Sequence, residues 1–230
     1  MRLYHTAYEE IPQPDVHHGR VNADFGQGFY TTDDQEFARR WAREKKGSTI
    51  YVNCYELDLT GLQIYRFGRG QDWSDYLFDN RAGKKDRLPQ EDVIIGPIAN
   101  DTIYDTFGII TSGMLKRSEA LRLLQLGPAY TQIVLKTEKA ASRLTWLGAI
   151  PLKGEDAARY REILKNEQEE YQRQVAQEME LITSEPEEEK ALAWEEIRTE
   201  HLVTDQYIDF RSSEFRFPDG STFAPYYNYS

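Results

Sequence analysis

The chain has 230 residues, of which 40% are hydrophobic and 13% are aromatic, and its formal net charge is −11. This composition can bury a sizeable core, so a disordered chain is excluded. The sequence has no apolar run near the roughly 18 residues of a membrane helix and no apolar stretch behind Arg2, so we expect neither a membrane span nor a secretory signal. The single cysteine, Cys54, cannot form an internal disulfide. Together these features predict a cytoplasmic protein.

Negative charge is concentrated in the last third of the chain. Acidic and basic side chains balance over residues 1–154, whereas residues 155–200 have a net charge of −9. The overall acidity argues against non-specific nucleic-acid binding, which requires Lys and Arg to neutralise phosphates. The neutral first part can still bind an anionic small molecule through a few arginines and backbone N–H groups. We therefore expect a folded domain over 1–154 and an acidic extension over 155–230.

The first elements are predicted from short aromatic and glycine-rich patterns. Residues 2–5 are apolar and aromatic, which predicts a strand leading into a loop. In the segment DFGQGFYTT at 24–32, two glycines precede an aromatic, β-branched run, which predicts a tight turn into a strand. An acidic start, a basic end and Gly47 as terminator predict a helix over 35–47, with Phe37 and Trp41 on one face.

Strand and helix patterns then alternate without a regular repeat. The predicted strands lie within 48–61, 62–68 and 91–101, and the predicted helices within 72–83, 102–113 and 118–127. Ser118 is the expected N-cap of the last of these helices. Residues 131–152 predict a strand, a short helix and a final strand. This order predicts an α+β domain with twisted, mostly antiparallel sheets.

The acidic extension shows a helical pattern followed by a hairpin pattern. The apolar residues that approximate one helical stripe are Ile163, Leu164, Tyr171, Val175, Met179 and Ile182. Ser184, Pro186 and Glu187 resemble a second helix start that continues through Leu202, so we expect a helical hairpin that packs on the first domain or on a helical partner protein. The tail alternates at 214–217 and turns at 218–220, which predicts a β-hairpin.

The sequence contains no P-loop, GxGxxG, HExxH or GxSxG pattern. Its four histidines and one cysteine lack the spacing of metal ligands, so no metal site is expected. Three residues at apparent strand ends or starts stand out as candidates for chemistry, namely His5, Tyr30 and Gln132. Taken alone, each is also explained as an ordinary structural residue of a strand.

Four ordered motifs resemble a known family. YHT at 4–6, DFGQGFYTTDDQEFARRWA at 24–42, DVIIGPIANDTIYDT at 92–106 and TQIVLKTEKAASRL at 131–144 resemble a bacterial family of uncharacterised function. That family is in turn similar to the mono-ADP-ribosyltransferases of the diphtheria-toxin and poly(ADP-ribose) polymerase type. The resemblance covers about residues 1–150. It implies an ADP-ribosyltransferase-like fold with split antiparallel sheets and flanking helices.

The resemblance also implies a site for NAD, the substrate from which ADP-ribose is transferred. The superfamily's His, Tyr and Glu lie on three core strands and map here onto His5, Tyr30 and Gln132. His5 would hydrogen-bond a ribose hydroxyl, the Thr6 backbone would hold the nicotinamide carboxamide, and the Tyr30 ring would stack on the nicotinamide. Gln132 departs from the pattern because an amide carries no charge to stabilise a sugar cation. Glu138 is the alternative carboxylate for this position.

Other charged residues are candidates from their position alone. Arg20 and Arg81 could contact the phosphates of NAD. Asp24 and Asp101 could orient an arginine or accept a proton from the acceptor substrate. The plainer interpretation makes Asp101 a helix cap and pairs Arg81 with Asp75 or Asp79 at the surface.

Three functions follow as expectations. The first is an NAD-dependent mono-ADP-ribosyltransferase, a toxin or effector whose acceptor is more readily a protein than a nucleic acid. The second is a module that binds NAD or ADP-ribose without turnover, because Gln132 replaces a carboxylate. The third is an interaction protein that acts through its C-terminal helices, with residues such as Leu164, Tyr171 and Val175 at the interface.

Overall fold

The computed structural model describes residues 1–41, 48–103, 115–184, 195–204, 209–216 and 222–229. The chain divides into two compact units, Met1–Ala176 and Gln177–Ser230. The boundary expected after residue 154 stays a prediction. No helix among the described residues is both long and apolar enough to cross a membrane.

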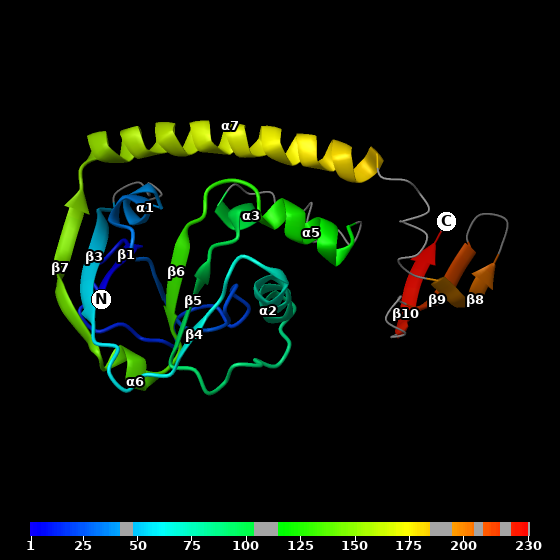
Figure 1. The fold of residues 1–230 in the computed structure, drawn as a ribbon, viewed down its shortest axis with the longest axis horizontal. Helices are drawn as coiled ribbons and strands as arrows, with labels where there is room; N and C mark the ends of the chain where they lie inside the picture. Colours follow the sequence, from blue (N-terminus) through cyan, green and yellow to red (C-terminus); the bar gives the residue numbers. More distant parts are fainter. Residues whose placement is uncertain (42–47, 104–114, 185–194, 205–208, 217–221, 230) are drawn as a thin grey trace. The chain divides into compact units, whose positions relative to one another are not determined.

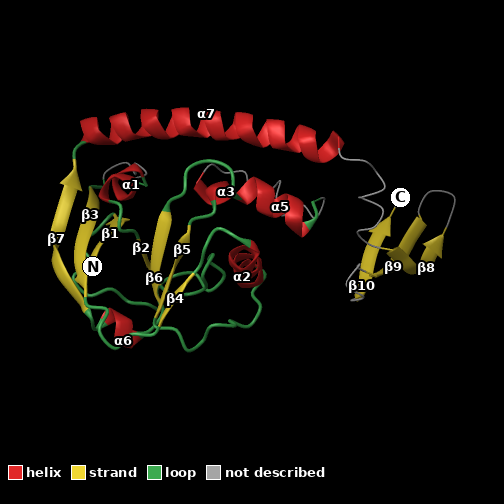
Figure 2. Cartoon of the chain, in the orientation of Figure 1, coloured by secondary structure: helices red, strands yellow, loops and turns green. Residues whose placement is uncertain are grey.

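The first unit contains two sheets with helices around them (Figure 1; Figure 2). One sheet has the order β1-β3-β7 and is antiparallel, with β1 at Arg2–Ala7, β3 at Ile50–Leu57 and β7 at Leu144–Leu152. The other has the order β2-β6-β5-β4, with β2 at Phe29–Thr31, β6 at Thr131–Leu135, β5 at Val93–Pro97 and β4 at Ile64–Arg66. Only β4 and β5 pair in parallel among these described strands. The prediction of an α+β protein with mostly antiparallel sheets is confirmed.

A single bridge joins the two sheets. The Tyr4 N–H donates to the Thr32 carbonyl at 2.8 Å, and the Thr32 N–H donates back to the Tyr4 carbonyl at 3.0 Å. The core beside this junction is formed by apolar side chains from both sheets, including Leu3, Phe29, Tyr55, Val93, Ile133 and Leu135. The bridge therefore fixes how β1 lies against β2, which decides the geometry of the site described below.

Among the described residues, five short helices flank the sheets of the first unit. They are α1 at Gln35–Arg40, α2 at Gln71–Arg81, α3 at Asn100–Ile103, α5 at Arg117–Leu124 and α6 at Glu138–Ala141. The predicted Ser118 cap is wrong, because α5 begins after Lys116, whose N–H donates to the Glu119 carboxylate at 2.8 Å. Most of the helix predicted over 102–113 lies outside the described residues.

The loop before β2 lies close to neighbouring backbone, which explains its glycines. A Cβ on Gly28 would lie 2.7 Å from the Leu135 carbonyl oxygen, and a Cβ on Gly19 would lie 2.5 Å from the Gly28 carbonyl oxygen. The Gln27 amide donates to the carbonyls of His17 and Gly19 at 2.7 and 3.1 Å. The glycine-rich approach to Tyr30 is therefore a fixed part of the structure.

The long helix α7, Gly154–Ser184, packs on the first unit along its early turns. Arg40 of α1 donates to the Glu167 carboxylate at 2.6 Å, and the Gly127 N–H donates to the Gln174 side chain at 3.1 Å. Tyr171 and Val175 are buried. The amphipathic stripe was expected to pack either on the first domain or on a helical partner protein. Up to Ala176 it packs on the first domain.

The second unit contains a three-stranded antiparallel sheet of order β10-β9-β8. Its strands are β8 at Glu195–Thr204, β9 at Asp209–Arg216 and β10 at Thr222–Tyr229. The predicted hairpin of β9 and β10 is confirmed. The predicted second helix is wrong over 195–204, because β-branched residues such as Thr199 and Val203 favour a strand and β9 supplies the pairing partner.

Candidate functional site

A pocket of about 250 Å³ lies where β1, β2 and β6 meet α1 and the loop before β2. Five of the residues predicted to bind NAD line it, namely His5, Thr6, Arg20, Tyr30 and Gln132, whereas Arg81 is not among the lining residues. His5 is on β1, Tyr30 on β2 and Gln132 on β6, and these strands are spatial neighbours because β1 bridges β2 and β2 pairs with β6. The structure therefore brings together residues that lie more than a hundred positions apart in the sequence.

The His5 ring is held in one tautomer by the backbone of β2. Its Nδ1 lies 2.6 Å from the Tyr30 carbonyl oxygen, which can only accept, so Nδ1 carries the proton. Burial lowers the pKa of His5, against the opposing effect of this hydrogen bond. The neutral ring leaves Nε2 as a hydrogen-bond acceptor in the pocket wall, which suits a hydroxyl group as its partner.

The backbone N–H and C=O groups of Thr6 face the pocket because the pairing between β1 and β2 does not continue beyond the bridge at Tyr4. Alternate residues of a strand direct their N–H and C=O groups to the same side, so Thr6 faces the same way as Tyr4, toward β2. A continued ladder would pair Thr6 with Tyr30, but the Tyr30 carbonyl accepts from His5 instead. The Thr6 hydroxyl donates to the Ala38 carbonyl. Thr6 can therefore offer a backbone donor and acceptor to an amide.

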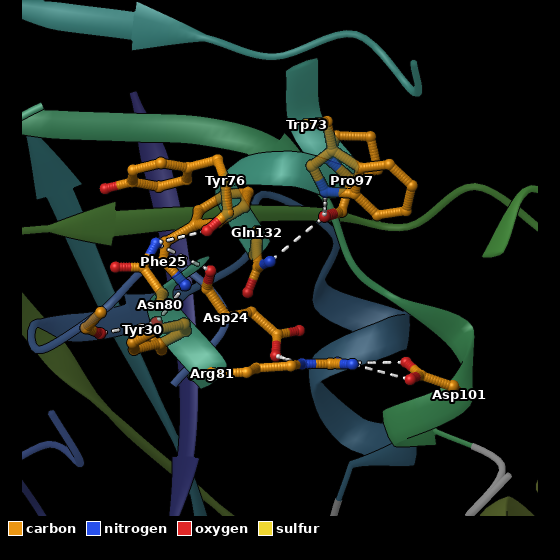
Figure 3. Close-up of polar contacts among 11 residues, drawn as sticks. Asp24, Phe25, Tyr30, Trp73, Tyr76, Asn80, Arg81, Pro97, Asp101 and Gln132 are labelled. Carbon is orange, nitrogen blue, oxygen red and sulfur yellow. Dashed lines mark hydrogen bonds and ion pairs between the residues drawn. The ribbon is translucent and has the colours of Figure 1, made fainter. Parts of the chain in front are cut away.

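The Tyr30 hydroxyl closes the glycine-rich loop onto its own strand (Figure 3). It donates to the Gly26 carbonyl at 2.8 Å and accepts from the Phe25 N–H at 2.9 Å. Burial raises the pKa of this phenol well above its usual value, against the effect of the Phe25 hydrogen bond. The hydroxyl is thus structural and stays protonated, and the part of Tyr30 available to a ligand is its ring.

The Gln132 amide is oriented by the end of β5. Its Nε2 donates at 3.1 Å to the Pro97 carbonyl, which also accepts from Trp73 Nε1 at 3.0 Å (Figure 3). A carbonyl cannot donate, so the amide nitrogen must lie on this side and Oε1 remains as the acceptor. The side chain is 5% exposed. This position favours an amide over a carboxylate, because a carboxylate has no N–H to donate and its oxygen would be repelled by the Pro97 carbonyl oxygen.

We expect Gln132→Glu to destabilise the protein by about 1–3 kcal/mol at pH 7.5, because a buried carboxylate loses the donor to Pro97. The folded-state pKa of the new carboxyl would lie above its unfolded value, so the loss appears as pH rises through that folded pKa and shrinks toward pH 5. Urea unfolding at the two pH values measures this. Gln132→Met has no charge, so its loss of stability should not depend on pH. If the loss in Gln132→Glu is also the same at both pH values, the expectation is contradicted.

The two candidate phosphate contacts have different surroundings. Arg20 is exposed, lines the pocket and makes no hydrogen bond or ion pair with the described residues. Arg81 is 8% exposed and is held by two carboxylates. Its Nε donates to Asp24 at 2.8 Å, and its two terminal nitrogens donate to Asp101 at 2.7 and 3.1 Å. Arg20 therefore remains a candidate for phosphate, whereas Arg81 is engaged within the protein.

The surface pairs expected for Arg81 are made by other residues. Asp75 pairs with Arg117 at 3.0 Å and Asp79 pairs with Lys84 at 2.8 Å. Asp101 is fully buried in α3 and holds Arg81, so the prediction that it only caps a helix is incomplete. Asp24 lines the pocket between Gln132 and Arg81, as the labelled side chains in Figure 3 show.

Glu138 does not reach the pocket. It lies in the first turn of α6, its side chain is 81% exposed, and it is 3.5 Å from His17 Nε2. Of the two residues considered for the third position, Gln132 is the one that lines the pocket. Trp41, predicted to share a helix face with Phe37, lies at the end of α1 and lines the pocket with partial exposure. No group of three metal-ligating side chains gathers within the described part of the chain.

Fold and site thus define an α+β protein with a ligand-sized pocket at the junction of the two sheets of its first unit. Residues 1–146 match the model of the DUF3990 family, described as a protein of unknown function. This match spans more than half of the chain, which therefore belongs to the DUF3990 family. Comparisons with curated proteins and with solved structures found no match.

Proposed function

We propose that this protein is an NAD-dependent mono-ADP-ribosyltransferase, and that the pocket binds the nicotinamide end of NAD. The observation that carries the proposal is the convergence of His5, Tyr30 and Gln132 on three neighbouring strands in one pocket. The proposal rests on the resemblance of these strands to the superfamily as well as on this geometry. A toxin or effector role, with a protein as acceptor, belongs to the same proposal.

Each wall of the pocket suits one part of nicotinamide riboside. The Tyr30 ring offers a flat apolar surface for the nicotinamide, and the Thr6 backbone offers a donor and an acceptor for its carboxamide. His5 Nε2 and Gln132 Oε1 offer acceptors for ribose hydroxyls. A volume of about 250 Å³ suits this half of the dinucleotide, and Arg20 lies where a phosphate could follow.

The proposed reaction breaks the bond between C1′ of the ribose and the nicotinamide nitrogen. The electron pair of that bond goes to the pyridinium ring, and positive charge develops over C1′ and the ribose ring oxygen. Fixing the leaving ring against Tyr30 and the ribose against His5 and Gln132 aligns the bond for cleavage. The acceptor, or water in NAD hydrolysis, then forms the new bond to C1′ and releases a proton.

The test is nicotinamide release from NAD by the purified full-length protein, measured by chromatography. We expect His5→Ala to reduce release about 100-fold, because it removes the acceptor that holds the ribose. His18→Ala is the matched control, since His18 is exposed in the loop before β2 and does not line the pocket. Equal background release by the unmodified protein and His5→Ala would refute catalysis at this site.

A second candidate function is NAD or ADP-ribose binding without turnover. The observation in its favour is that the third position holds an uncharged amide directed at Pro97. Saturable NAD binding without any nicotinamide release would support it. The interaction-protein alternative has less support, because Tyr171 and Val175 are buried within the first unit.

A further inference from the structure

We infer that Asp24 is a catalytic residue of this pocket, and that its carboxylate supplies the negative charge and proton acceptor that Gln132 cannot supply. This inference rests on the proposed function. Among the described residues that line the pocket, Asp24 is the one carboxylate. Glu138 lies elsewhere on the surface, and Asp101 is not among the pocket residues.

The backbone around Asp24 is fixed by local hydrogen bonds. The Gly26 N–H donates to the Ala23 carbonyl at 2.8 Å, which closes a turn with Asp24 inside it. The Asn80 amide donates to the Asp24 carbonyl at 3.3 Å. The Tyr30 hydroxyl holds the next two residues of the same turn. The carboxylate is therefore presented from a rigid turn beside the Tyr30 ring.

One oxygen of the Asp24 carboxylate is engaged and the other is available to a ligand. Oδ1 accepts from Arg81 Nε at 2.8 Å, whereas Oδ2 accepts no hydrogen bond from any described residue. The side chain is 14% exposed, although Asp101 in the same cluster is fully buried. Asp24 is also one of the residues that line the pocket.

Asp24 is the carboxylate of the cluster that lies on the pocket side. Arg81 binds Asp101 through two nitrogens and Asp24 through one. Arg20, which also lines the pocket, attracts Asp24 electrostatically. Burial raises the pKa of Asp24, opposed by Arg81, and a carboxylate with a raised pKa is a better proton acceptor near neutral pH.

Asp24 has two roles in the transfer, which are to stabilise the sugar cation and to accept a proton. As the C1′–nitrogen bond breaks, its electrons leave with nicotinamide, and the Asp24 carboxylate stabilises the positive charge on the sugar. The acceptor hydroxyl, or a water molecule, forms the new C1′–oxygen bond and gives its proton to Asp24 Oδ2. The carboxyl then returns this proton to solvent. Arg81 acts as a positioning residue, because it holds Oδ1 and leaves Oδ2 directed to the reaction.

The test compares Asp24→Asn with Glu138→Gln in the full-length protein. Asparagine at 24 retains an oxygen for Arg81 but loses the charge, and Arg81 keeps its two bonds to Asp101, so the fold should survive. We expect nicotinamide release to fall about 100-fold while the NAD dissociation constant changes less than about threefold. Glu138→Gln removes a carboxylate that is exposed and does not line the pocket, and it should retain release within a few-fold.

The outcomes separate the inference from the function on which it rests. Unmodified protein that neither binds NAD nor releases nicotinamide overturns both. Unmodified protein that releases nicotinamide while Asp24→Asn releases it equally well overturns only the role of Asp24. A loss of release in Asp24→Asn that comes with an equal loss of NAD binding and a lowered melting temperature also overturns it, because Asp24 would then serve the fold alone.

Discussion

Replacing Arg81 with methionine should destabilise the protein by about 3–5 kcal/mol at pH 7, the largest stability effect that we expect from a single substitution here. Arg81 is the cation that compensates the carboxylates of Asp24 and Asp101, and all three side chains are largely or fully buried. Methionine fills similar space but leaves two carboxylates facing each other without a counter-charge. Urea unfolding at pH 7 measures the loss.

The same substitution should become less damaging in acid. Burial already raises the pKa of Asp24, and without Arg81 this folded-state pKa would rise further, so the folded state binds more protons than the unfolded state. Stability then falls as pH rises through this folded pKa and recovers toward pH 5. Combining Arg81→Met with Asp24→Asn and Asp101→Asn should restore most of the loss at pH 7. Arg66→Met, at an exposed position of β4, is the control. A loss of stability in Arg81→Met that is the same at pH 7 and at pH 5 would contradict this account.

Tyr30→Ala should abolish NAD binding and cost about 3 kcal/mol of stability, because it removes both the ring and the hydroxyl that closes the loop. Tyr30→Phe should separate the two roles. It keeps the ring, so NAD binding should weaken less than about fivefold, whereas the lost hydrogen bonds to Phe25 and Gly26 should still cost about 1–3 kcal/mol.

Calorimetric titration with NAD and thermal unfolding of each variant provide the two measurements. Tyr8→Ala is the control, since Tyr8 is an exposed aromatic outside the pocket. If Tyr30→Ala binds NAD as well as Tyr30→Phe does, the ring does not stack on the ligand and the proposed placement of nicotinamide is wrong.

Most elements of the first unit could be predicted because their signals are local. The glycines before Tyr30, the apolar run of β5 and the amphipathic pattern of α2 each determine an element within a few residues. Two of the failed predictions were decided by long-range contacts. Residues 195–204 have a helical spacing but gain a strand partner in β9, and Arg81 reaches Asp24, 57 positions away, rather than the nearby Asp79.

The candidate site was only partly predictable for a related reason. His5, Tyr30 and Gln132 were found through the resemblance of their strands. The exposed backbone of Thr6 depends on His5 taking the Tyr30 carbonyl, and the orientation of Gln132 depends on Pro97. Such contacts between strands arise only once the sheets have formed, so no spacing in the sequence could reveal them.

The contact between α1 and α7 means that the shape of the pocket and its chemistry are encoded in separate stretches of the chain. Phe37 and Trp41 form one wall of the pocket, and the neighbouring Arg40 is held by Glu167, which lies beyond the residues matched to the family. Relatives with the same polar groups but a different continuation after residue 146 could hence accommodate ligands of other dimensions. Sequence differences after residue 146 would change which ligands fit the pocket without altering any group that contacts the ligand.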